Sequence, residues 1–119
     1  YYVVQLQSGL NQAWRKINVV QANYIPVDKP WILLGTDSSQ VRLPTNNIQD
    51  LRKKTSLPQA FGVIAGSSGY FGPQGILSFV ALSQQVESTI FLMNESDVHA
   101  CTHRIDKIPE WEKYVRYVK

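Results

Sequence analysis

The 119-residue chain contains one cysteine, one methionine and two histidines. Because Cys101 has no second cysteine to pair with, an internal disulfide is excluded, which favours a reducing compartment. The longest apolar stretches, 31–34 and 76–82, are far shorter than the roughly 18 to 20 residues that cross a bilayer. The start at Tyr1, without a methionine, favours a trimmed product or an excised domain. We therefore expect a cytoplasmic protein that makes no membrane contact.

Positive charge is missing from the middle of the chain. Residues 61–103 contain no lysine or arginine and three acids, whereas residues 1–60 contain seven cations against three acids. The other five cations fall in residues 104–119, and the net charge is +3. Basic surfaces attract nucleic acid or acidic proteins by long-range steering, although a solvated helix surface has the same composition. The longest basic run is Arg52–Lys54.

Disordered tails and linkers contain few aromatic residues, and this chain has three Trp, six Tyr and four Phe. Its apolar fraction of 44% and charged fraction of 18% are typical of a globular protein. A chain of this length commonly forms one domain around one core. We predict a single domain that covers residues 1–119.

The first 60 residues contain signals for strands and helices in turn. Residues 1–6 and 31–34 are short apolar segments bounded by turn residues, which predicts strands. A short strand is expected at 40–43, and a short helix at 46–54 that Pro58 closes. Ser8 is a suitable N-cap for another helix, whose apolar face has the i, i+3, i+4, i+7 spacing and consists of Leu10, Ala13, Trp14 and Ile17.

Three apolar runs of strand length follow, at 61–65, 76–83 and 88–93, and they predict a β-meander. Residues 66–75 would then form a glycine-rich hairpin loop with Tyr70 and Phe71 near its tip, where aromatic side chains either anchor a partner or fold back on the sheet. The loop lacks the Lys-Ser/Thr ending of a P-loop and joins two strands in this interpretation. We therefore do not expect it to bind a nucleotide phosphate.

The last residues predict a strand at 98–104 and an amphipathic helix that begins at Pro109. The inner face of this helix would contain Trp111, Tyr114, Val115 and Val118. Because the predicted strands are grouped together in the chain, the pattern indicates an α+β fold. We expect an antiparallel or mixed sheet of about five strands, with two or three helices packed mainly on one face.

His99, Cys101 and His103 alternate along the predicted last strand, so their side chains would share one face. Imidazole and thiolate groups suit zinc or copper, but same-face neighbours on a strand lie roughly 6.5 to 7 Å apart, too far for three ligands of one ion. We predict no metal and no cofactor. The same side chains suit acid–base or nucleophilic chemistry, with Cys101 as the thiolate or the two histidines as acid and base.

The leading hypothesis is a small non-enzymatic domain that binds a protein or nucleic acid. Its predicted binding residues are the two loop aromatics and the basic side chains of the expected helices, namely Tyr70, Phe71, Arg15, Lys16, Arg52, Lys53 and Lys54. The first alternative is a small hydrolase or nuclease that uses His99, Cys101 and His103. The second is an accessory structural domain of a larger assembly.

Overall fold

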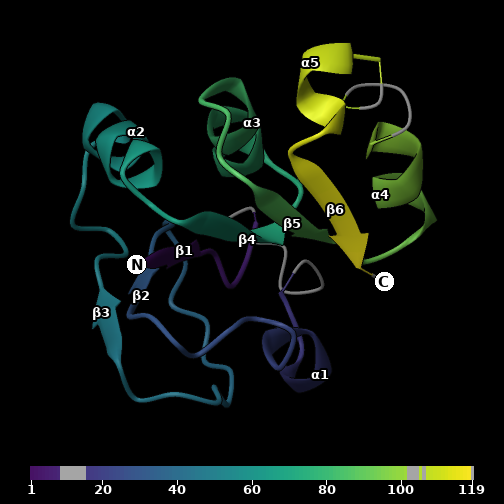
Figure 1. Ribbon diagram of the computed structural model, residues 1–119. Helices are drawn as coiled ribbons and strands as arrows, with labels where there is room; N and C mark the ends of the chain where they lie inside the picture. Colours follow the sequence, from purple (N-terminus) through teal and green to yellow (C-terminus); the bar gives the residue numbers. More distant parts are fainter. Residues whose placement is uncertain (9–15, 102–104, 106, 119) are drawn as a thin grey trace.

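All strands of the sheet run parallel in the computed structural model, which describes residues 1–8, 16–101, 105 and 107–118 (Figure 1). The strands are β1 (Tyr2–Val4), β2 (Trp31–Leu33), β3 (Ile48–Asp50), β4 (Gly69–Pro73), β5 (Ser88–Phe91) and β6 (Val115–Val118). The helices are α1 (Val19–Ala22), α2 (Leu57–Ala65), α3 (Ile76–Ser83), α4 (Glu95–Ala100) and α5 (Pro109–Glu112). No helix in these described ranges is long and apolar enough to cross a membrane.

The strand order across the sheet is β3-β2-β1-β4-β5-β6. The chain moves outward from β1 to β3, returns to pair β4 with the other side of β1, and then moves outward again to β6. Tyr2 is accordingly paired with Trp31 on one side and with Gly69 on the other. This is the order of a doubly wound sheet, and the direction of winding reverses between β1 and β4.

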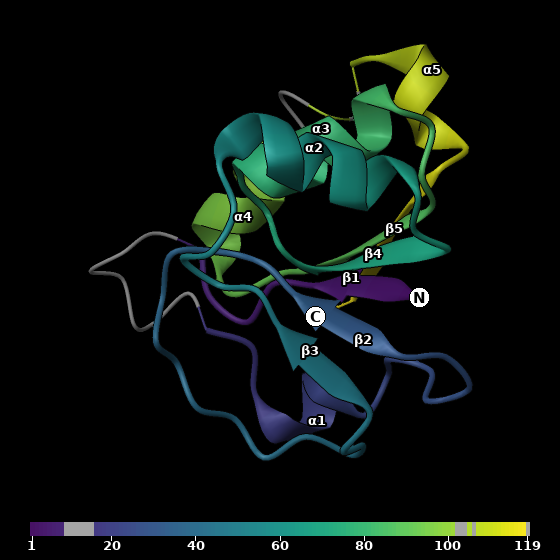
Figure 2. The same ribbon diagram turned by 90° about the vertical axis from the view of Figure 1, so that its left-hand side faces the viewer.

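The two directions of winding place helices on opposite faces of the sheet, because crossovers between parallel strands are right-handed. Helix α1 lies on one face, and α2 and α3 lie side by side on the other (Figures 1 and 2). Alternate residues of β1 divide between the two cores. Tyr2 and Val4 pack in the core on the α1 face, whereas Val3 packs against Ile64 and Val80 on the α2 and α3 face.

The central strands have no solvent-exposed side, which explains their composition. Every residue of β1, β4 and β5 is buried. Strand β1 accordingly has a continuous apolar sequence, Tyr2–Val4, without the alternation of a half-exposed strand.

The predicted α+β class is wrong, because the sheet is entirely parallel and strands alternate with helices along the chain. The predicted meander fails at two of its three runs. Residues 61–65 belong to α2, and residues 76–83 form α3. The expected hairpin loop at 66–75 contains β4, which is a central strand.

The other local predictions have mixed outcomes. Strands are confirmed at β1, β2 and β5. The expected helix at 46–54 is wrong, since it contains β3, and residues 40–43 form no strand. The expected strand at 98–104 begins inside α4, while residues 102–104 lie outside the described residues. The final helix is four residues long and gives way to β6, because Val115–Val118 completes the edge of the sheet.

Candidate functional site

A cavity of about 460 Å³ lies at the carboxyl edge of the sheet, where the direction of winding reverses. Its lining comes from the segments that directly follow β1, β2 and β4 and from the start of α2. The lining residues are Gln5, Ser8, Gly35, Thr36, Thr55, Ser56, Leu57, Ala60, Gly75, Ile76 and Leu77. In open α/β sheets this crevice is where ligands bind. Its volume falls in the range of small-molecule sites, about 300 to 1,000 Å³.

Helix α3 begins at this cavity without a side-chain cap. Its N-cap residue is Gly75, and no side chain in the described part of the chain caps the helix. The Ser78 hydroxyl instead bonds to Gly75, accepting from its N–H at 3.0 Å and donating to its carbonyl at 2.7 Å. The first backbone N–H groups of an α-helix have no intrahelical partner and carry partial positive charge. Ile76 and Leu77, whose N–H groups are of this kind, line the cavity.

Ser8 places a hydroxyl against the same helix end. The residue is 7% exposed and lines the cavity. A Cβ added to Gly75 would lie 2.6 Å from Ser8 Oγ, so the close approach requires glycine at position 75. Within the residues that the structure describes, the Ser8 hydroxyl has no hydrogen-bond partner. Ser8 lines the cavity, so its hydroxyl is available to a ligand bound there.

A network of buried polar side chains supports the floor between β1 and β4. The Tyr70 hydroxyl donates to Gln5 Oε1 at 2.8 Å, and Gln5 Nε2 donates to the Gln7 carbonyl at 3.1 Å. The Ser39 hydroxyl donates to the side-chain oxygen of Gln7. Gly72 allows β4 to approach this network, because a Cβ there would lie 2.6 Å from the Tyr70 hydroxyl oxygen. Satisfied buried networks hold the surrounding backbone in one arrangement.

Arg52 holds together the loops that form the β2 and β3 side of the cavity. Its Nη1 donates to Asp37 Oδ2 at 3.1 Å and to the Ser39 carbonyl at 2.7 Å, and its Nη2 donates to Asp50 Oδ2 at 2.8 Å. The Lys53 N–H adds a bond to the Gly35 carbonyl at 2.9 Å. The hydrogen bond with Arg52 lowers the pKa of Asp50, and the same bond raises the pKa of Arg52.

The two helices at the cavity differ in how their first turns are satisfied. In α2 the Ser56 hydroxyl accepts from the Gln59 N–H at 3.2 Å, and Gln59 Oε1 accepts from the Ser56 N–H at 2.8 Å. This capping box leaves α2 with few free donors. The start of α3 therefore leaves more backbone N–H groups without a partner than the start of α2.

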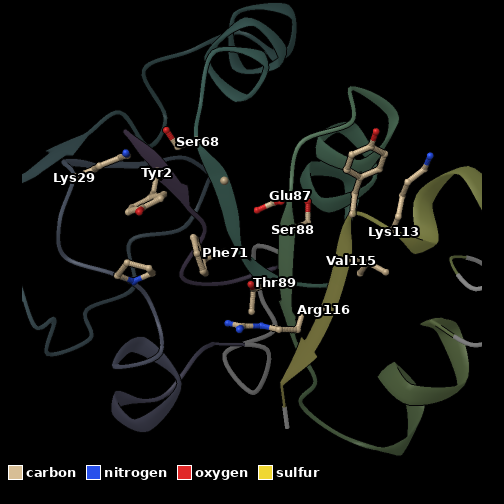
Figure 3. A pocket seen from close by; sticks show the side chains of 13 residues that line it. Tyr2, Lys29, Ser68, Phe71, Glu87, Ser88, Thr89, Lys113, Val115 and Arg116 are labelled. Carbon is tan, nitrogen blue, oxygen red and sulfur yellow. The ribbon is translucent and has the colours of Figure 1, made fainter.

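A second cavity, of about 480 Å³, opens at the amino edge and over the α1 face of the sheet (Figure 3). Phe71, Thr89 and Arg116 line it from β4, β5 and β6. The Tyr2 hydroxyl on its border donates to Asp28 at 2.7 Å, and this bond raises the pKa of Tyr2 and lowers the pKa of Asp28. Within the described ranges, this cavity is not lined by the start of α2 or α3, the two helices of eight or more residues. The cavity also lies at the edge of the sheet opposite to the one at which parallel sheets bind ligands.

The structure does not bring the predicted catalytic residues onto one face. His99 lies in α4 and is exposed, whereas Cys101 directly follows that helix and is buried. Two residues that are two positions apart in a helical segment point in different directions, because the helix repeats every 3.6 residues. His103 lies outside the described residues, and the described ones contain no group of three His, Cys, Asp or Glu side chains that could hold a metal. An enzymatic role for these residues stays a prediction.

The predicted binding residues lie in several unconnected places. Tyr70 and Phe71 are in β4 and are buried, so neither forms an exposed tip. Arg15 lies outside the described residues. Lys16 is exposed, and its backbone forms an isolated antiparallel β-bridge with Gln7. Arg52 is engaged by Asp37 and Asp50, while Lys53 and Lys54 are exposed directly before the cavity residue Thr55. Their binding roles stay predictions.

Sequence reasoning did not identify Ser8 and Gly75 as site residues. The local pattern predicts a helix cap at Ser8 and the end of a hairpin loop at Gly75. Once β4 is known to be a strand that leads into α3, Gln74–Gly75 becomes a strand-to-helix turn, the kind of connection at which helix N-termini bind phosphate in other proteins. Comparisons of the chain with protein-family models, with curated proteins and with solved structures find no match.

Proposed function

We propose that this chain binds a small phosphorylated ligand in the carboxyl-edge cavity. The phosphate group would accept hydrogen bonds from the N–H groups of Ile76 and Leu77 and from the Ser8 hydroxyl. The observation that carries the proposal is the Ser8 hydroxyl, which faces the cavity and lies against the start of α3, a helix without a side-chain cap in the described part of the chain.

The lining of the cavity is uncharged, and Asp37, which directly follows the lining residue Thr36, is paired with Arg52. No carboxylate in the lining therefore repels a phosphate. The helix start supplies positive potential, and backbone N–H groups are a common phosphate cradle. Lys53 and Lys54 are exposed on the loop that enters α2, where their charge would raise the local concentration of an anionic ligand. The hypothesis of a nucleic-acid or protein partner also includes Lys53 and Lys54 among its binding residues, and it remains a separate hypothesis.

Calorimetric titration with inorganic pyrophosphate tests the proposal. We expect saturable binding to the unmodified chain. Ser8→Ala should weaken it about tenfold or more, because a hydrogen bond to a charged group contributes about 1.5 to 3 kcal/mol. Gly75→Ala should weaken it further, since the new Cβ would lie 2.6 Å from Ser8 Oγ and would displace the cradle.

Gly62→Ala is the matched control. Gly62 lies in the exposed part of α2, and a Cβ there would meet nothing within 4 Å. This variant should bind pyrophosphate like the unmodified chain, and circular dichroism should show that all three variants are folded. The proposal is wrong if pyrophosphate does not bind, or if folded Ser8→Ala and Gly75→Ala variants bind it as well as Gly62→Ala does.

A further inference from the structure

Two large apolar side chains stand exposed at the mouth of the carboxyl-edge cavity. Leu57 is 52% exposed and Ile76 is 66% exposed, and both line the cavity. Each occupies the first position of its helix, Leu57 in α2 and Ile76 in α3. The two helices pack next to each other on one face of the sheet (Figure 2). The cavity therefore has one exposed apolar side chain on each of the two helices that border it.

These positions contrast with the other exposed apolar residues of the described chain. Val19, Val20, Tyr24 and Val27 belong to α1 and the segment after it, on the opposite face of the sheet. Leu57 and Ile76 add little to the core, since more than half of each residue remains in solvent. Apolar walls with a few convergent polar groups are the usual lining of a small-molecule site.

The cavity is also larger than a phosphate group requires. The phosphate cradle consists of the Ser8 hydroxyl and the N–H groups of Ile76 and Leu77, and a phosphate group fills only part of the roughly 460 Å³. The lining also includes the hydroxyl-bearing residues Thr36, Thr55 and Ser56. The site thus combines an anion cradle, neutral hydroxyl groups and an apolar pair, which matches a ligand with a phosphate, a polyhydroxylated ring and a flat apolar ring.

We infer that the ligand of this cavity is a nucleoside phosphate whose base lies between Leu57 and Ile76. This inference rests on the proposed function, because it places the phosphate at Ser8 and the start of α3. The ribose would lie against the threonine and serine hydroxyls at the entrance to α2. The base would cover the exposed apolar surface of Leu57 and Ile76, and this burial would add affinity that a bare phosphate does not gain.

The test compares ADP, GDP, CDP and UDP with inorganic pyrophosphate in the same calorimetric titration. At least one nucleotide should bind about tenfold more tightly than pyrophosphate. In the Leu57→Ser variant this advantage should fall about threefold or more, while the affinity for pyrophosphate stays within about twofold. Val20→Ser is the matched control, since Val20 is 68% exposed and lies in α1 on the other face. It should retain the full advantage.

The possible results separate a failure of the nucleotide inference from a failure of the phosphate site. If pyrophosphate binds through Ser8 but no nucleotide binds more tightly, the inference is overturned and the proposed phosphate site stands. If a nucleotide binds more tightly and keeps its full advantage in the folded Leu57→Ser variant, the base lies elsewhere and the inference is equally overturned. If neither nucleotides nor pyrophosphate bind, the proposed function fails together with the inference.

Discussion

At the scale of single residues, Arg52 shows how an apparently solvated cation becomes structural. The sequence places it in the longest basic run of the chain, beside Lys53 and Lys54. Its side chain is only 9% exposed, and its donors bond to Asp37, Asp50 and the Ser39 carbonyl. These partners lie 13 to 15 residues before it or two residues before it. The distant partners are visible only after β2 and β3 have paired.

Removing the Arg52 charge should destabilise the fold. Arg52→Met would leave the Asp37 carboxylate buried without its cation, and breaking a buried pair in this way costs about 3 to 5 kcal/mol. Urea unfolding monitored by tryptophan fluorescence measures the loss. Lys54→Met, at an exposed position of the same run, should change the free energy of unfolding by less than about 0.5 kcal/mol. Equal values for the two variants would contradict the structural role of Arg52.

Asp50 should stabilise the fold at neutral pH and lose this contribution under strongly acidic conditions. Its hydrogen bond with Arg52 lowers its pKa in the folded chain below the ordinary value of 3.8. The stabilisation is therefore complete above that value and is lost as the pH falls through the lower, folded pKa. Its side chain is 47% exposed, so the contribution should stay below about 1 kcal/mol.

The comparison of the unmodified chain with Asp50→Asn, by urea unfolding across pH, measures this contribution. The difference in unfolding free energy should be constant from neutral pH down to about pH 5 and should vanish under strongly acidic conditions. A difference that grows as the pH falls would show that the folded pKa of Asp50 is raised and would contradict the assigned hydrogen bond.

At the scale of elements, the sequence correctly predicts some strands but assigns a strand to segments that form helices. Strands β1 and β2 are short apolar segments between turn residues, and both are confirmed. Residues 76–83 form an apolar run that is too short to separate a buried strand from a buried helix by periodicity. They form α3, whose buried residues lie on more than one side of the helix. The conformation of residues 76–83 therefore depends on their burial in the folded protein and not on their local sequence pattern.

A local signal at the start of α2 contradicts the expectation that Pro58 ends a helix. Proline ends a preceding helix, but it also suits the first turn of a following one. Ser56 and Gln59 have the three-residue spacing of a capping box, and the structure contains both of its hydrogen bonds. That spacing could have identified the helix and corrected the meander. Asn18 and Gln21 mark α1 in the same way.

At the scale of the whole molecule, the fold class depends on α2 and α3. With strands at 61–65 and 76–83, the chain has consecutive strands and an antiparallel or mixed sheet; with helices there, strands and helices alternate and the sheet is parallel. The site then follows from topology. Ser8 and Gly75 are 67 positions apart in the sequence and meet because β1 and β4 are neighbours at the point where the winding reverses. No local pattern around either residue contains that information.

The most direct test of the phosphate site is a ¹H–¹⁵N correlation titration of the labelled chain with inorganic pyrophosphate. A phosphate held at the start of α3 should shift the backbone amide signals of Gly75, Ile76 and Leu77 most strongly, together with that of Ser8. The account is contradicted if these signals do not move, or if the largest shifts occur instead at the amino edge of the sheet, at Ser68, Gly69 and Lys113.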